Sequence, residues 1–243
     1  MLYIDIMHIQ EVIRNGEGRF ATQSGWIEAL MEQEHPFPLF MRLSDRLCLL
    51  IGCEGEAVRK GAALLAAGAR LRILAERLDD VFMNAADAGR VERLDGPFAP
   101  EMLDGVRLVV SASADEALNA RVHAAAEARG IWINVVDQPR FCTVIWPAVV
   151  ERSPVTVAIS TAGRAPALAG YVRRRIEALL SERLGFLAER LAEWRGEVPG
   201  GLEARGRFWR RLLDGGVAER FLAGDEAGAE RLVREALARG EKE

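Results

Sequence analysis

An uninterrupted apolar run, Leu47-Cys48-Leu49-Leu50-Ile51, is followed directly by the small-residue sequence Gly52-Cys53-Glu54-Gly55-Glu56-Ala57. Such a run is typical of a parallel strand that is covered on both faces. A glycine-rich turn after such a strand is typical of dinucleotide-binding folds. There the first glycine makes the turn, the second admits the phosphate and a third small residue lets the next helix pack closely. Gly52 and Ala57 fill the first and third roles, whereas Glu54 occupies the second.

The carboxylate of Glu54 bears directly on whether this turn can hold an anion. A helix N-terminus attracts a phosphate through its N–H groups, and its dipole contributes about 0.3 to 1 kcal/mol. Two like charges about 4 Å apart, at an effective dielectric constant of about 20, repel by about 4 kcal/mol. Either Glu54 turns to solvent, aided by the flexible Gly55, or dinucleotide affinity falls by up to about three orders of magnitude. On this motif alone, a plain strand-to-helix turn without a nucleotide is an equal alternative.

Short apolar runs alternate with amphipathic stretches after this turn, which predicts parallel strands joined by helices on both faces of a sheet. The predicted strands are residues 47–51, 71–75, 107–112 and 131–136. The character of the chain changes after Pro147, where one more β-branched run, residues 155–159, belongs to a short β/α connector. Gly68 and Gly130 are predicted to end the first two helices. Ser113 and Glu116 have the spacing of a capping box, which predicts the start of the second helix.

The C-terminal part of the chain has a helical character. Pro166 suits the first turn of a helix, and apolar residues then recur at three- and four-residue intervals in several segments. These segments are residues 176–194, 207–213 and 225–239. We therefore predict an α/β protein with a Rossmann-like parallel sheet. Its parts are an N-terminal extension (1–35), the Rossmann-like domain (36–146), a small β/α segment (147–178) and a helical C-terminal domain (179–243).

Composition excludes several classes of function. The formal net charge of -4, with both signs mixed along the chain, provides no basic stripe for nucleic acid. No apolar stretch reaches the roughly 20 residues of a membrane span, and no signal sequence opens the chain, so we expect a cytoplasmic protein that does not bind membranes. The three cysteines and three histidines follow no ligand spacing, so no metal site is expected.

Two further regions carry candidate chemistry. Asp137 ends a predicted parallel strand, and ligands of open α/β sheets bind at the carboxyl ends of strands, so it could act as a general base. A turn aspartate before Pro139 is the alternative. Glu76, just past the second strand, could hold a ribose hydroxyl or simply be a solvated acid. The loops 152–154 and 160–166 each carry one cation, which suits either anion binding or plain connection.

Several short motifs stand in a fixed order from Pro36 to the C-terminus. They are Pro38-Leu39-Phe40, Arg59-Lys60, Ala66-Ala67-Gly68-Ala69-Arg70, Leu118-Asn119-Ala120-Arg121, Asn134-Val135-Val136-Asp137 and Arg152-Ser153-Pro154. In this order and spacing the chain resembles the precorrin-2 dehydrogenase and sirohydrochlorin ferrochelatase family, which also forms the N-terminal module of siroheme synthase.

The resemblance implies NAD-dependent oxidation of precorrin-2 to sirohydrochlorin and, in some members, insertion of ferrous iron. It also implies a homodimer built through residues 147–178, with a tetrapyrrole cleft between the dinucleotide domain and the dimer region, and it makes Asp137 the catalytic residue. The cofactor-binding residues expected on this basis are Gly52, Cys53, Glu54, Gly55, Ala57, Glu76 and Ser113. Because arginine suits a substrate with many carboxylates, the expected substrate-binding residues are Asn134, Arg140, Arg152, Ser160, Thr161 and Arg164.

The chain also departs from the family pattern. Cys53 and Glu54 replace the second and third of three consecutive glycines, and Ala162 replaces the first glycine of a later loop. The usual Ala-Thr-Asp-Asp reads Ala-Ser-Ala-Asp at residues 112–115. Two alternatives therefore remain open beside an NAD-dependent dehydrogenase. They are a chelatase that does not use NAD, and a non-catalytic tetrapyrrole-binding dimer.

Overall fold

The computed structural model describes residues 36–240, so the extension predicted at residues 1–35 lies outside the described residues, as do residues 241–243. The chain divides into two compact units, residues 1–42 and 43–243. The elements below all belong to the second unit.

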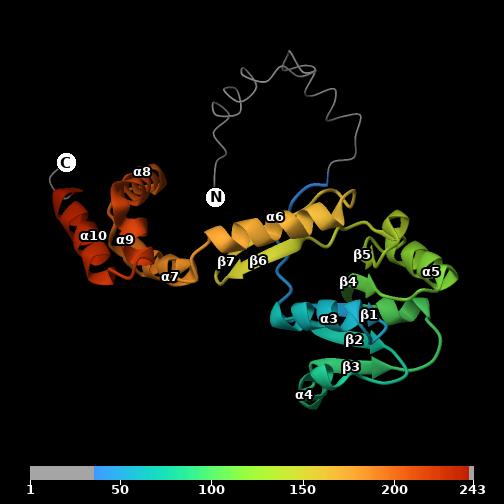
Figure 1. Cartoon of the computed structure of the whole chain (residues 1–243). Coiled ribbons are helices and arrows are strands. Elements are labelled where there is room, and N and C mark those ends of the chain that lie inside the picture. The colour runs from blue at the N-terminus through green and yellow to red at the C-terminus, as the bar shows by residue number, and fades with distance from the viewer. Residues whose placement is uncertain (1–35, 241–243) are drawn as a thin grey trace, which may run out of the picture. The chain divides into compact units, whose positions relative to one another are not determined.

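A five-stranded, entirely parallel sheet forms the first part of this unit (Figure 1). Its strands are β1 (Leu47–Ile51), β2 (Arg70–Leu74), β3 (Val91–Leu94), β4 (Val106–Ser111) and β5 (Trp132–Val135). They lie in the order β3-β2-β1-β4-β5. The predicted Rossmann-like sheet is therefore confirmed. Only the edge strand β3 was not predicted, because its sequence Val-Glu-Arg-Leu is short and half charged.

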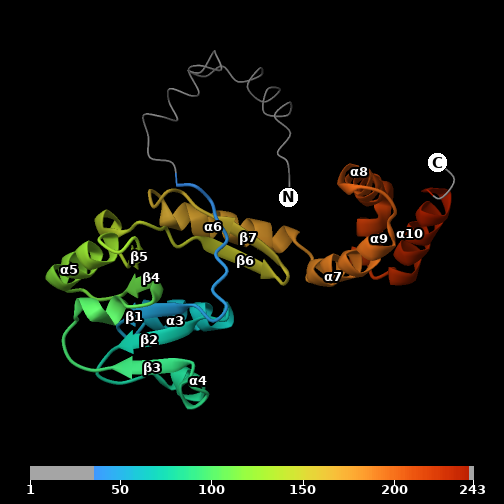
Figure 2. The same ribbon diagram turned by 180° about the vertical axis from the view of Figure 1, so that it is seen from behind.

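Helices cover both faces of the sheet (Figure 2). The helix α3 (Glu56–Ala66), the 3-10 turn η1 (Asp80–Phe82) and α4 (Met83–Asp87) follow β1 and β2. The 3-10 turn η2 (Pro100–Leu103), α5 (Glu116–Glu127) and η3 (Pro139–Phe141) follow β3, β4 and β5. As predicted, Gly68 and Gly130 follow the ends of α3 and α5, both with positive φ.

The all-apolar strand β1 supplies two cores at once because successive side chains point to opposite faces. Cys48 and Leu50 join the α3 core, and Leu49 and Ile51 join the α5 core. All four are nearly or completely buried, and full burial of a leucine or isoleucine contributes about 1.5 to 3 kcal/mol. The close contact of α3 with this face depends on Gly61, where a Cβ atom would lie 2.7 Å from Phe82 and 2.8 Å from Leu50.

The start of α5 differs from the prediction. Its N-cap is Asp115, whose carboxylate accepts a hydrogen bond from the Leu118 N–H at 3.1 Å. The Ser113 hydroxyl instead accepts a hydrogen bond from the Asp115 N–H at 3.1 Å, one turn before the helix. The predicted capping box was therefore wrong by two residues, because the carboxylate two positions later is in place to accept the first helical N–H group.

Beyond the parallel sheet, the antiparallel strands β6 (Ala148–Arg152) and β7 (Val155–Ile159) form a hairpin that packs on α6 (Pro166–Leu179; Figure 1). Further helical segments follow, and side chains of α7, α8, η5, α9 and α10 form a third core. They are α7 (Leu184–Trp194), the 3-10 turn η4 (Arg195–Glu197), α8 (Leu202–Leu212), α9 (Ala218–Leu222) and α10 (Glu226–Gly240). A π-helical segment, η5 (Leu213–Val217), joins α8 to α9.

The helix predicted over residues 176–194 is two helices, α6 and α7, separated at residues 180–183. The Arg152 guanidinium explains the break, because it donates hydrogen bonds to the carbonyl oxygens of Glu177 and Leu180 at the end of α6. A long-range contact of this kind leaves no trace in the apolar periodicity. Strand β6 was also not predicted.

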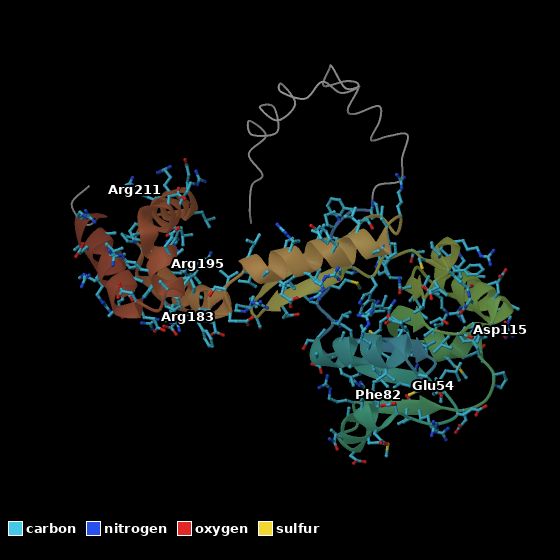
Figure 3. The ribbon with its side chains drawn as sticks, in the orientation of Figure 1. Glu54, Phe82, Asp115, Arg183, Arg195 and Arg211 are labelled. Carbon is cyan, nitrogen blue, oxygen red and sulfur yellow. The ribbon has the colours of Figure 1, made fainter. Side chains whose placement is uncertain are left out.

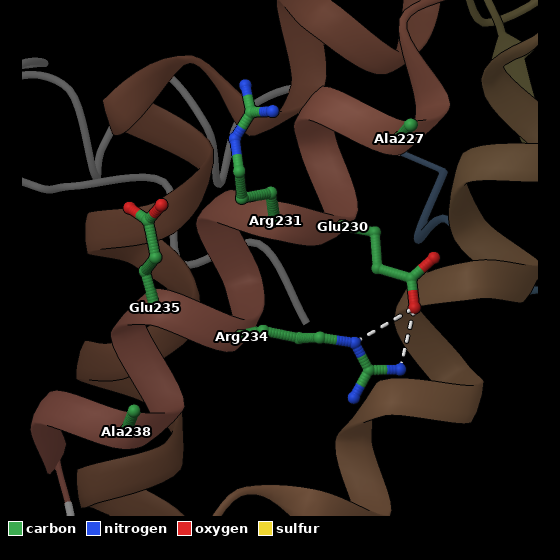
Figure 4. Close-up of a pocket in the computed structure, with 6 residues that line it drawn as sticks. All are labelled: Ala227, Glu230, Arg231, Arg234, Glu235 and Ala238. Carbon is green, nitrogen blue, oxygen red and sulfur yellow. Dashed lines mark hydrogen bonds and ion pairs between the residues drawn. The ribbon is translucent and has the colours of Figure 1, made fainter.

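Arginine-carboxylate pairs link the C-terminal helices, and Figure 3 labels one of the arginines, Arg183. Arg183 pairs with Glu226, donates to the Phe221 carbonyl oxygen at 3.1 Å and lies over the Phe221 ring. Figure 4 shows a shallow hollow on α10 in which Arg234 binds Glu230 through two hydrogen bonds. All residues that line it belong to α10, so it is a groove between surface side chains. Across residues 36–240, no helix combines the length and apolar character that a bilayer crossing requires.

We predict that Gly61→Ala destabilises the fold. Alanine gains about 1 kcal/mol in helix propensity, but overpacking a filled core costs about 1 to 3 kcal/mol, and both Phe82 and Leu50 are fully buried. We expect a net loss of about 1 kcal/mol, seen as a melting temperature lower by about 2 to 4 °C. The control is Gly206→Ala in α8, where a Cβ atom meets open space and should stabilise the protein. A melting temperature raised equally by both changes would contradict the tight contact at Gly61.

Candidate active site

The carboxyl ends of β1, β4 and β5 meet along one edge of the sheet. Ile51, Ser111 and Val135 pair across these strands. Gly52 follows β1 and Val136 follows β5. The Val136 N–H donates to the Ser111 carbonyl oxygen at 2.8 Å. The chain proceeds outward from β1 in one direction and from β4 in the other, so the topological switch point lies between β1 and β4. Ligands of open α/β sheets bind at this point.

The turn after β1 has the geometry of an anion-binding turn. Gly52 has a φ of 97°, which favours glycine, and its N–H donates to the Leu74 carbonyl oxygen at 3.0 Å. A Cβ atom at Gly52 would lie 3.7 Å from the Ala57 Cβ and 3.8 Å from Ala112. Gly55 is the N-cap of α3 and makes no side-chain cap hydrogen bond, whereas the Ala57 N–H donates to the Glu54 carbonyl oxygen at 3.0 Å. N–H groups at the start of such a helix suit a phosphate.

Three side chains of the turn have different surroundings. Glu54 is exposed, and Figure 3 shows it at the arrowhead end of the sheet. The Glu56 carboxylate is bound by Arg59 at 2.9 and 2.5 Å, and this hydrogen bond lowers its pKa. The Cys53 thiol accepts a hydrogen bond from the Asp79 N–H at 3.0 Å, and burial raises its pKa. Glu56 is therefore engaged with Arg59 along the helix, whereas Glu54 is exposed at the turn itself.

The two other predicted cofactor residues also follow strand ends. Glu76 is exposed just beyond β2, and its carbonyl oxygen accepts a hydrogen bond from Arg93 at 2.6 Å. Ser113 follows β4, in a loop that a buried polar pair supports. The Ser111 hydroxyl donates to the Asn119 side-chain oxygen at 2.6 Å, and the Asn119 amide donates to the Ser113 carbonyl oxygen at 2.8 Å.

Asp137 is exposed two residues beyond the end of β5, in a left-handed conformation with a φ of 58°. Aspartate tolerates this conformation better than most residues. Hydrogen bonds close the base of its loop. The Thr143 N–H donates to the Ile133 carbonyl oxygen at 2.9 Å, and the Cys142 thiol accepts from the Val135 N–H at 3.1 Å. The carboxylate is therefore accessible on a loop whose two ends are fixed.

A buried lysine beside this loop was not identified as a site residue from the sequence. Lys60 of α3 is only 6% exposed, and its ammonium donates to the Asn134 side-chain oxygen at 2.6 Å. It also lies over the Trp146 ring, 5.1 Å from the ring centre. Burial lowers its pKa, and the negative charges of Glu56 and Asp137 oppose that effect. One signal was present, because Lys60 lies three residues after Ala57 on the apolar face of the helix.

The predicted substrate-binding residues differ in their surroundings. Arg140 is exposed and pairs with Glu116 at 2.5 Å. Ser160, Thr161 and Arg164 lie in the loop between β7 and α6, where the Ser160 hydroxyl accepts from the Ala162 N–H and the Thr161 hydroxyl from the Ala165 N–H. These four remain candidates for contact with a ligand.

Asn134 and Arg152 have other partners. Asn134 is 6% exposed, and its amide is used by Lys60 on one side and by the Val144 carbonyl oxygen on the other. The Arg152 side chain is 10% exposed, pairs with Glu182 and binds two carbonyl oxygens at the end of α6. Their geometry favours positioning roles over the direct substrate contacts that we predicted. Among residues 36–240, no group of three or more His, Cys, Asp or Glu side chains could hold a metal ion.

Three family models match consecutive parts of the chain. A model for NAD(P)-binding domains matches residues 39–148. A model described as sirohaem biosynthesis protein central matches residues 152–179, and one described as sirohaem synthase dimerisation region matches residues 183–237.

Several curated siroheme synthases are similar to the chain. The Chromobacterium violaceum protein is 41% identical over 207 residues, and that of Pseudomonas aeruginosa strain UCBPP-PA14 is 42% identical over 206 residues. Each match covers 84% of this chain and 44% of the relative, so the chain spans less than half the length of these proteins. A solved structure named SirC, precorrin-2 dehydrogenase, has a TM-score of 0.64 at 20% identity. It is matched over 86% of this chain and 100% of its own length, and it supports the fold.

We predict that the three thiols react slowly with iodoacetamide in the native protein at neutral pH. Burial raises the pKa of Cys48 to about 11 and raises the pKa values of Cys53 and Cys142. Because the thiolate is the reactive species, alkylation of Cys53 and Cys142 should accelerate only as the pH rises past about 8.5, the usual thiol value. Cys48 should remain unmodified until the protein unfolds. Peptide mass spectrometry after timed alkylation measures each site, and rapid labelling of Cys53 at pH 7 would contradict its protected environment.

Proposed function

The chain belongs to the precorrin-2 dehydrogenase and siroheme synthase family, and we propose that it oxidises precorrin-2 to sirohydrochlorin with NAD. We propose that it does so in the cytoplasm, as part of siroheme biosynthesis.

One observation carries this proposal: the Gly52 turn and the Asp137 loop follow β1 and β5 at the same edge of the sheet, on either side of β4. Two strand spacings separate them, or about 10 Å. A dinucleotide whose pyrophosphate lies at the turn can extend its nicotinamide toward the loop over such a distance. The site therefore suits a reaction that needs a redox cofactor and a base together.

The chemistry assigns each part a task. Oxidation of precorrin-2 removes a hydride and a proton, and NAD bound at the turn would accept the hydride. The N–H groups at the start of α3 would bind its pyrophosphate, with Gly52 and Ala57 allowing close approach. Asp137, exposed on its fixed loop, would accept the proton as general base. Glu76 and Ser113, beyond β2 and β4, would contact the rest of the cofactor.

The tetrapyrrole substrate carries many carboxylates, which guanidinium groups bind well. We propose that Arg140 and Arg164 bind them, with hydrogen bonds from Ser160 and Thr161. Asn134 and Arg152 would act indirectly, by positioning the segments to which they are hydrogen bonded. The same Asp137 carboxylate could also remove pyrrole N–H protons during insertion of ferrous iron, which would then be a substrate of a second reaction.

We also propose a homodimer. The dimerisation-region model matches residues 183–237, so the dimer would draw on the C-terminal helices as well as on residues 147–178. Large apolar side chains are exposed on both parts, with Leu168, Tyr171 and Leu179 on α6 and Phe186 on α7. A second copy of the chain would cover them. The domain boundaries at residues 146/147 and 178/179 remain part of this proposal.

Glu54 favours a second candidate, a sirohydrochlorin chelatase that does not use NAD. Its exposed carboxylate stands where the family turn has glycine, and a carboxylate facing a phosphate would weaken NAD binding. A tetrapyrrole-binding dimer without catalysis is the further alternative. The exposure of Glu54 is what allows NAD binding in the leading proposal, because the side chain is free to point into solvent.

The central experiment is anaerobic incubation of the purified protein with precorrin-2, with and without NAD. We expect NAD to stimulate the formation of sirohydrochlorin, which is monitored through its absorbance. In a separate incubation, ferrous iron is added to supplied sirohydrochlorin to test chelation. No stimulation at millimolar NAD would reject the dehydrogenase, and metal insertion into sirohydrochlorin without oxidation of precorrin-2 would identify the chelatase.

Replacement of Glu54 tests how far its charge weakens the cofactor site. We expect Glu54→Gly to bind NAD at least about tenfold more tightly, and Glu54→Gln to bind it with intermediate affinity, because charge and bulk are removed in turn. Titration calorimetry measures the affinities, and Glu127→Gln on the exposed face of α5 is the control. Unchanged affinity in both variants would mean that the carboxylate already avoids the phosphate.

Asp137→Asn tests the proposed base without disturbing the loop. Asparagine also tolerates the left-handed conformation, so the variant should fold normally. We expect the turnover rate to fall by about 10² to 10⁴, the usual contribution of a general base, with little change in NAD affinity. Asp87→Asn, on the exposed surface of α4, is the matched control. Full activity of the Asp137 variant would remove this residue from the mechanism.

A further inference from the structure

Lys60 is a charged side chain in an apolar position. It is 6% exposed, and its neighbours on the buried face of α3 are Ala57, Gly61 and Leu64. The chain has only one other lysine, Lys242, and uses arginine for its 30 remaining cations. Burial of an ammonium is costly unless it is well paired. Almost all other cations of the chain are guanidinium groups. A compact ammonium at this buried position therefore indicates that the size and shape of the cation are important there.

The partners of Lys60 connect the two halves of the candidate site. Its helix begins at the Gly52 turn, whereas its hydrogen-bond acceptor, the Asn134 side-chain oxygen at 2.6 Å, lies on β5. The Asn134 amide then donates to the Val144 carbonyl oxygen at 2.9 Å, on the segment that returns from the Asp137 loop. Trp146 covers the ammonium from the end of that same segment. One buried cation thus ties the cofactor turn to both ends of the loop that carries Asp137.

The base of this loop is closed by the pairs around Asn134. The Thr143 and Val144 N–H groups both donate to the Ile133 carbonyl oxygen, at 2.9 and 3.2 Å. Among these contacts, the Asn134 side chain both joins β5 to the returning segment of the loop and reaches α3. Loss of the ammonium would leave the Asn134 oxygen buried without its donor, which is unfavourable enough to shift the loop base.

We propose that Lys60 is a positioning residue, which holds the Asp137 loop at a fixed place relative to the cofactor turn through Asn134 and Trp146. It touches neither substrate nor cofactor, because its charged end is enclosed. The expected effect on catalysis rests on the proposed function. The contact of Lys60 with Asn134 and Trp146, called the clamp below, can be measured without substrate.

The charged groups near Lys60 define how the clamp should respond to pH. Glu56 and Asp137 favour the ammonium, as does the Cys142 thiolate when present, and Arg59 disfavours it. Burial outweighs these effects and lowers the pKa of Lys60 below its usual range. The ammonium is therefore lost as the pH rises through a value below about 10.4, the usual lysine pKa. Activity should then decline on the alkaline side, and Lys60→Arg, which keeps its charge there, should move that decline to higher pH.

The test compares Lys60→Met, Lys60→Arg and the control Arg107→Met, an exposed cation near the amino end of β4. Hydrogen-deuterium exchange of residues 133–146 measures the clamp without cofactor or substrate. We expect exchange in Lys60→Met to be at least about tenfold faster than in the native protein, with the control unchanged. In the precorrin-2 assay we expect the turnover rate of Lys60→Met to fall at least about thirtyfold, while KM for NAD stays within about threefold. Lys60→Arg should recover part of the activity.

Each result supports or overturns the positioning role of Lys60. Native exchange and native turnover in Lys60→Met would overturn the proposal. Lower turnover with native exchange would also overturn it, because Lys60 would then act on the chemistry rather than through the loop. If the native protein shows no NAD-stimulated oxidation, the proposed function fails, and the exchange experiment alone then confirms or rejects the clamp. If Lys60→Met does not fold, the exchange and alkaline profile of Lys60→Arg provide the same test.

Discussion

The register that pairs β1 with β4 and β4 with β5 is the constraint on which the rest of the site depends. It aligns Ile51, Ser111 and Val135, so the residues that follow them emerge side by side at the switch point. The backbone hydrogen bonds that continue beyond the strands, from Ala112 to Ile51 and from Val136 to Ser111, extend this alignment into the loops. The turn and the candidate base are therefore brought together by main-chain pairing, before any side chain contributes.

Side-chain packing then fixes how closely the helices that follow these loops approach the sheet. The alternation of β1 anchors α3 on one face and α5 on the other, and Gly61 lets α3 approach the sheet closely. That approach brings Lys60 within reach of Asn134. The packing of the domain and the geometry of the site are thus connected through a single helix.

Much of this fold could be predicted from the sequence because local signals agreed. The apolar run at β1, the glycines after α3 and α5, and Pro166 at the start of α6 each carry a physical preference that the structure retains. The failures share a different cause. The break between α6 and α7 depends on Arg152, and the start of α5 depends on competition between Ser113 and Asp115. Contacts made across the fold leave no periodic trace in the chain.

The same reason explains which site residues were found. Gly52 and Asp137 lie in loops that follow apolar runs, and such positions can be recognised locally. The roles of Asn134 and Lys60 arise from a contact between residues 74 positions apart. The hydrogen bond between them could not be inferred from either segment alone. The proposed reaction comes from the family resemblance of the ordered motifs, because neither a single residue pattern nor the geometry specifies a reaction by itself.

The central claim is that this turn still uses its dinucleotide despite Glu54. Nuclear magnetic resonance of protein labelled with ¹⁵N-glycine, titrated with NAD, tests it most directly. The account predicts saturable shifts of the Gly52 and Gly55 amide signals, with the Gly206 signal of α8 unmoved. Absence of any shift at Gly52 and Gly55 at millimolar NAD would contradict it.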